Sequence, residues 1–126
     1  MPTKHQPTYL LRFFFDYGAG GCLWSGNEAT SEKFGVGVLD APFFDLDGNM
    51  TKEAKIKLRD STRQKVLALD ERYYQSLNPD NPTGPSPWDK SQWNEFYVQA
   101  RVLHQEIADI LGTDFEVVYE AEKNDD

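Results

Sequence analysis

Apolar and polar residues alternate over several short segments of the chain, which is the pattern of β-strands with two different faces. Residues 9–17 carry apolar side chains on both faces and are predicted to form a central strand. The glycine-rich residues 18–21 are typical of a hairpin turn, with residues 22–24 as the returning strand. The same alternation predicts a third strand over residues 36–39 and a final strand over residues 115–119.

Apolar residues spaced three and four apart predict a long amphipathic helix in the second half of the chain. Its apolar positions are Trp93, Phe96, Tyr97, Ala100, Leu103, Ile107, Ile110 and Leu111. Two start signals compete: Ser86 followed by Pro87, or Asp89 as an N-cap with Gln92 three residues later. Gly112 is expected to end the helix.

Two further helices are predicted before the long one. Residues 61–64 read as a capping box that opens a helix running to about Leu77. Residues 27–34 predict a short helix that stops at the glycine following it. The segment 51–60 is ambiguous, because its alternation favours an edge strand protected by lysines while a helix starting at Thr51 is the competing interpretation.

Two loops are marked by composition. Residues 78–88 hold four of the seven prolines and are predicted to be a stiff connection between the two main helices. Residues 45–49 match the first three alternating ligands of a calcium loop, but Met50 and Ile56 stand where such a loop needs glycine and glutamate. A polar turn is therefore the better interpretation of residues 45–49.

These elements predict a single domain over residues 1–126. The expected fold is α+β, a two-layer sandwich with a small, mainly antiparallel sheet of about four or five strands and two main helices on one face. Residues 1–8 are expected to be a flexible arm and residues 120–126 an acidic tail. The apolar fraction of 39% is too high for a disordered chain.

The net charge of the chain limits the kinds of partner that it can bind. Thirteen basic residues against 21 acidic ones give a net charge of −8, which opposes binding to nucleic acid or to an anionic membrane. The same charge attracts a basic protein partner. Residues 52–72 carry +3 and residues 106–126 carry −7, so the two regions are expected to pair or to form solvated faces.

Few residues are candidates for metal binding or for nucleophilic catalysis. His5, His104 and Cys22 match no zinc-site spacing, so neither a metal nor a cofactor is expected. Cys22 is predicted to be an inert buried thiol, since no neighbouring base activates it. A single cysteine and an N-terminus without an apolar stretch favour a cytoplasmic protein.

Three stretches, CLWSGNEATSEKFG, SLNPDNPTGPSPW and LGTDFEVVYE, together resemble a loose group of small acidic bacterial proteins of uncharacterised function. The resemblance covers most of the chain. It implies a bacterial origin and one compact domain, and it assigns no site.

The leading hypothesis is a non-enzymatic protein-binding module, of the kind in which an immunity protein neutralises a basic toxin by surface complementarity. It rests on class analogy and charge. The expected contact surface is acidic and aromatic, with Trp88 and Asp89 from the proline-rich loop and Glu116, Glu120 and Glu122 from the last strand. Trp88 is expected to be either an interface anchor or a lid on the core.

Two alternatives remain open. A small enzyme would place His104 or Asp16 with other carboxylates in a pocket between sheet and helices. An adaptor subunit of a larger assembly would expose an apolar patch around Trp24 or Trp88.

Overall fold

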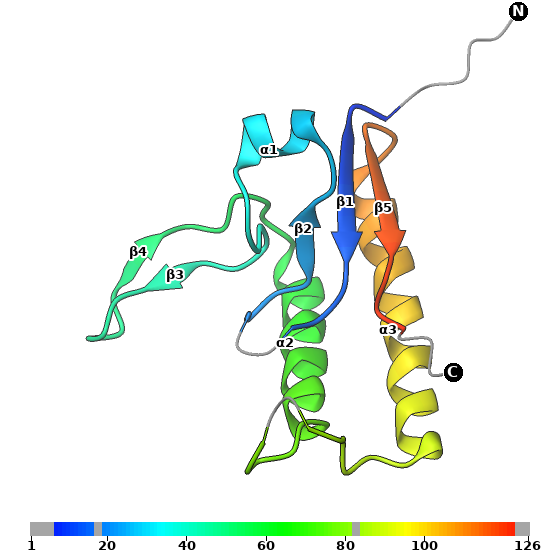
Figure 1. Cartoon of the computed structure of the whole chain (residues 1–126). Coiled ribbons are helices and arrows are strands. Elements are labelled where there is room, and N and C mark those ends of the chain that lie inside the picture. The colour runs from blue at the N-terminus through cyan, green and yellow to red at the C-terminus, as the bar shows by residue number, and fades with distance from the viewer. Residues whose placement is uncertain (1–6, 17–18, 82–83, 123–126) are drawn as a thin grey trace, which may run out of the picture.

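The computed structural model describes residues 7–16, 19–81 and 84–122, and it arranges them as helices packed on small sheets (Figure 1). In chain order the elements are β1 (Tyr9–Phe13), β2 (Leu23–Ser25), α1 (Glu28–Phe34), β3 (Phe43–Phe44), β4 (Met50–Lys52), α2 (Asp60–Gln75), α3 (Lys90–Leu111) and β5 (Phe115–Tyr119). The predicted α+β class is confirmed.

The principal sheet has the strand order β2-β1-β5, so β1 is the central strand as predicted. β1 pairs with β2 in antiparallel orientation and with β5 in parallel orientation. The remaining strands, β3 and β4, form a separate antiparallel pair. The strands are therefore divided between two sheets, although the sequence predicted a single one.

The core lies between the principal sheet and the two long helices (Figure 1). Leu11, Phe13 and Phe15 point from the first strand segment into this layer and are buried. The helices contribute Val66 and Leu69 from α2 and Phe96, Ala100, Leu103 and Ile107 from α3. Each large apolar side chain buried here contributes about 1.5–3 kcal/mol relative to exposure.

The ends of α3 follow the sequence signals closely. The side chain of Asp89 accepts a hydrogen bond from the Gln92 amide at 2.8 Å, and the Gln92 side chain accepts one from the Asp89 amide at 3.0 Å. This reciprocal capping box selects Asp89 over Ser86 as the start. Gly112 ends α3 with a φ of +82°, a conformation that favours glycine.

The start of α2 differs from its prediction. The helix begins at Asp60 with Arg59 as N-cap, and the Arg59 side chain makes no capping hydrogen bond. Ser61 already lies inside the helix, so the predicted capping box at residues 61–64 is wrong. The helix can begin earlier because the Arg59 carbonyl accepts from the Arg63 amide at 2.9 Å.

Two strand predictions also fail. Residues 36–39 form no strand: Val38 makes a single bridge to Trp24, because Gly35 and Gly37 have φ angles of +95° and +88° that interrupt an extended chain. In the ambiguous segment, β4 ends at Lys52 and residues 53–59 are irregular. Neither a strand over residues 55–59 nor a helix from Thr51 forms.

The connection over residues 78–88 is irregular in its described part, as its prolines predicted. The first strand ends at Phe13, earlier than predicted. Residues 1–6, 17–18, 82–83 and 123–126 lie outside the described residues, and with them most of the predicted arm and of the acidic tail.

Candidate functional site

The acidic side chains predicted for partner contact lie on β5 and just after it, and two of them are paired within the chain. Glu120 accepts hydrogen bonds from the Arg12 guanidinium at 2.7 and 3.0 Å. Glu122 pairs in the same two-pronged manner with Arg101, whose Nε donates at 2.9 Å. Glu116 is exposed and makes no ion pair with any described residue.

The two residues predicted from the proline-rich loop lie at the start of α3. Asp89 is exposed and caps the helix. Trp88 is half-buried, with its ring 4.9 Å from that of Trp93 and 5.7 Å from that of Phe96. The Arg72 guanidinium covers the Trp88 ring at 5.1 Å. The ring therefore packs on the core and acts as a lid.

The five predicted residues do not form one compact patch. Glu116 and Glu120 are four positions apart along β5 and the residue that follows it, which corresponds to about 13 Å. Asp89 precedes Arg101, the partner of Glu122, by twelve positions of helix, or about 18 Å. The start of β5, which carries Glu116, and the start of α3 lie toward opposite ends of this flank (Figure 1).

The contacts of His104 join α3 to β5. Its Nε2 lies 2.6 Å from the Val117 carbonyl oxygen, which links α3 to β5. The ring packs edge-on against Phe13 and Tyr119, with centroid separations of 5.5 and 5.4 Å. These contacts hold the helix on the sheet.

A buried polar cluster, which the sequence pattern did not indicate, connects β2 to α2. Asp40 accepts hydrogen bonds from the Cys22 and Leu23 amides at 2.9 and 3.0 Å. Arg63 lies 3.7 Å from the Asp40 carboxylate and donates to the Gly20 carbonyl at 2.7 Å. Burial raises the pKa of the Asp40 carboxyl, while these donors and Arg63 oppose the rise.

Cys22 lies against the same cluster. Its side chain is buried, and its Sγ lies 3.6 Å from Asp40. Burial, and secondarily the Asp40 charge, raises the pKa of the Cys22 thiol well above its ordinary value, so the thiolate is disfavoured. The prediction of a buried Cys22 is confirmed.

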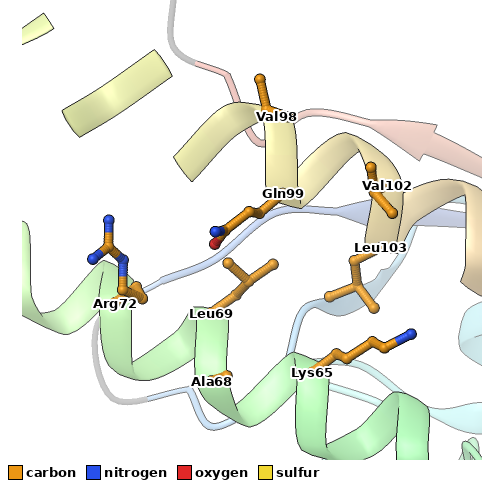
Figure 2. A pocket seen from close by; sticks show the side chains of 8 residues that line it. All are labelled: Lys65, Ala68, Leu69, Arg72, Val98, Gln99, Val102 and Leu103. Atoms are coloured by element: carbon orange, nitrogen blue, oxygen red, sulfur yellow. The ribbon is translucent and has the colours of Figure 1, made fainter. Parts of the chain in front are cut away.

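A groove of 310 Å³ runs between the two long helices (Figure 2). Its apolar walls come from Ala68, Leu69, Val98, Val102 and Leu103, and Lys65, Arg72 and Gln99 border it. The Lys65 amine is paired with Glu106 at 2.5 Å. A second hollow of 430 Å³ lies between α1 and the β3–β4 pair. Neither is lined by His104 or Asp16, the residues that an enzymatic pocket was expected to contain.

The β3–β4 pair, here called the apolar hairpin (residues 43–52), is the most exposed apolar feature among the described residues. Phe44 and Met50 are 58% and 55% exposed, and Leu46 at the turn is completely exposed. An adaptor subunit was expected to expose an apolar patch around Trp24 or Trp88. Trp24 is instead half-buried, and its ring stacks on that of Phe14 at a centroid distance of 4.8 Å. Apolar residues on both sides of a polar turn were the available sequence signal for the hairpin.

A model of the Serratia CdiI immunity protein-like family matches residues 42–122, which run from the apolar hairpin through β5. The chain belongs to this family. Membership confirms the hypothesis of a non-enzymatic immunity protein that neutralises a protein toxin. No curated protein matches the chain. Among the described residues, no helix of this immunity protein is both long and apolar enough to cross a bilayer.

Membership also supplies the name that the earlier resemblance lacked. Of the three stretches that carried that resemblance, the second and third lie within the matched segment, and CLWSGNEATSEKFG precedes it. The matched segment thus includes both long helices, the apolar hairpin and β5.

Proposed function

We propose that the toxin bound by this immunity protein is basic, and that electrostatic attraction brings the two proteins together. The net charge of −8 supports this proposal, because a strongly charged surface accelerates association with a partner of opposite charge. A single buried free cysteine agrees with action in the reducing cytoplasm.

The flank formed by β5 and the start of α3 is proposed to contribute this attraction through Asp89, Glu116, Glu120 and Glu122. Glu116 is the best placed of the four, since it is exposed, has no internal ion pair among the described residues and, unlike Asp89, does not cap a helix. Glu120 and Glu122 contribute less, because Arg12 and Arg101 neutralise them. Trp88 presents only the part of its ring that the core leaves uncovered.

The direct test is titration calorimetry of the purified protein with the purified product of the neighbouring open reading frame. Immunity proteins are encoded beside the toxins they restrain, so this product is the appropriate probe. We expect a complex whose affinity falls as salt is raised. Absence of binding at low salt, or binding that is insensitive to salt, would contradict the proposal of a basic toxin attracted by charge.

The flank itself is tested by a pair of charge reversals. Glu116→Lys and Glu71→Lys each change the net charge from −8 to −6, and both replace exposed glutamates. Glu71 lies on α2, away from β5. If the flank faces the toxin, Glu116→Lys slows association several-fold more than Glu71→Lys does. Equal effects would show that only the overall charge matters and would remove the flank from the proposal.

A further inference from the structure

The apolar hairpin is held in a defined shape although it packs little against the rest of the molecule. Figure 1 shows it standing to one side of the principal sheet, away from the two long helices. The Asp45 carboxylate accepts hydrogen bonds from the Asp47 and Asn49 amides at 3.0 and 2.9 Å. Gly48, with a φ of +85°, completes the turn. The tip is therefore a fixed turn.

The apolar side chains of the hairpin have little to cover them. Phe44 is paired with Met50 across the strands, so their side chains share one face, and both are more than half exposed. Leu46 projects from the turn and contributes nothing to the core. Three apolar groups gathered on a projecting element are typical of a protein-binding surface.

Acidic groups flank these apolar side chains. Asp45 and Asp47 stand on either side of Leu46, and both are exposed. The tip thus presents an apolar knob between two carboxylates. Its complement is an apolar hollow bordered by basic side chains, which is a combination that a basic toxin can offer.

We propose that the apolar hairpin is the anchor of the immunity complex and inserts Leu46, supported by Phe44 and Met50, into such a hollow on the toxin. This inference rests on the proposed function, because it takes a basic toxin as the partner. A second copy of the chain is a poorer occupant: two acidic tips would meet, and each molecule carries −8.

The test compares two double variants of the full chain by calorimetry and surface-binding kinetics with the neighbouring gene product. Phe44→Ser/Leu46→Ser alters the hairpin, and Val98→Ser/Val102→Ser makes a similar change to exposed apolar residues of α3. We expect the hairpin variant to bind about 100-fold more weakly, mainly through faster dissociation, and the α3 variant to bind as the wild type does. Circular dichroism checks that both variants are folded.

The contribution of the carboxylates beside Leu46 is tested by Asp47→Lys, which places a positive charge next to Leu46. It is expected to weaken binding more than tenfold, since a like charge would then face the basic border. Wild-type affinity in both the hairpin variant and Asp47→Lys would overturn the anchor while leaving the proposed function intact. If the wild type itself fails to bind, both proposals fail. A wild-type dimer that dissociates in the hairpin variant would also overturn the anchor, because the hairpin would then serve self-association.

Discussion

Replacing Trp88 by alanine separates the two roles that an aromatic residue on a stiff loop can have. A fully buried tryptophan replaced by alanine costs about 3–5 kcal/mol, and the half-buried Trp88 should lose about half of that. The contacts agree with this size. Two aromatic pairs, with Trp93 and Phe96, are worth about 0.5–1.5 kcal/mol each. The Arg72 guanidinium over the ring adds about 0.5–1 kcal/mol.

We therefore expect Trp88→Ala to lower the free energy of unfolding by about 1.5–2.5 kcal/mol, measured by urea denaturation followed by circular dichroism. Val98→Ala is the control, because Val98 is a 55% exposed residue of α3 whose truncation should change stability by less than about 0.5 kcal/mol. Toxin affinity at a temperature where Trp88→Ala remains folded should fall less than about tenfold. Unchanged stability together with a large loss of affinity would show that Trp88 does not act as a lid on the core and is instead an anchor of the interface.

Two further predictions concern the ionic contacts of α2. Asp40→Ala should destabilise the protein by about 3 kcal/mol or more in urea denaturation, because it leaves two buried amides without their acceptor and Arg63 without this ion-pair partner. A loss below about 1 kcal/mol would contradict this account. The hydrogen bond from Lys65, followed by that from Thr62, lowers the pKa of Glu106 from its ordinary value of 4.5. A carboxyl whose pKa is lowered on folding stabilises the protein above its unfolded pKa, and this contribution is lost as the pH falls through the lower folded value. Glu106→Gln should therefore lose stability at pH 7 and show a weaker dependence on pH below 4.5 than the wild type, whereas parallel pH profiles would show that the pair contributes nothing.

The elements that the sequence predicted well are those fixed by local interactions. The start of α3 depends on Asp89 and Gln92, which are three residues apart, and its buried face follows from a spacing that the helix itself imposes. The short helix α1 likewise begins at Asn27, whose side chain accepts from the Thr30 amide, and stops before Gly35. Such signals need no knowledge of the rest of the fold.

The start of α2 was mispredicted from a local signal, whereas strand pairing, including that of residues 36–39, depends on distant parts of the chain. Val38 and its neighbours alternate like a strand, but the chain there turns at two glycines with positive φ and pairs only once with Trp24. The parallel pairing of β1 with β5 joins segments about a hundred residues apart, and alternation within each strand says nothing about which neighbour it takes. Pairing partners are a property of the tertiary structure.

Some features of the candidate site can likewise be predicted from the sequence, and others depend on the tertiary structure. Net charge can be counted from the sequence, but whether a carboxylate is available cannot, because Glu120 is neutralised by Arg12 from the other end of the chain. The apolar hairpin was overlooked for a related reason. Two adjacent phenylalanines normally indicate a core strand, and only the structure shows that the core already closes without them.

The acidic flank and the apolar hairpin can both serve one complex, although they lie on different sides of the molecule (Figure 1). Charge acts over a Debye length of about 8 Å at physiological ionic strength and changes mainly the rate of encounter. Desolvated apolar contacts act only on touching and change mainly the rate of dissociation. If the proposals hold, substitutions on the flank and on the hairpin affect different rate constants and their effects on affinity add, since the two sites share no partner residues. Strong coupling between them would mean instead that both lie within one contact surface and that the toxin wraps around the immunity protein.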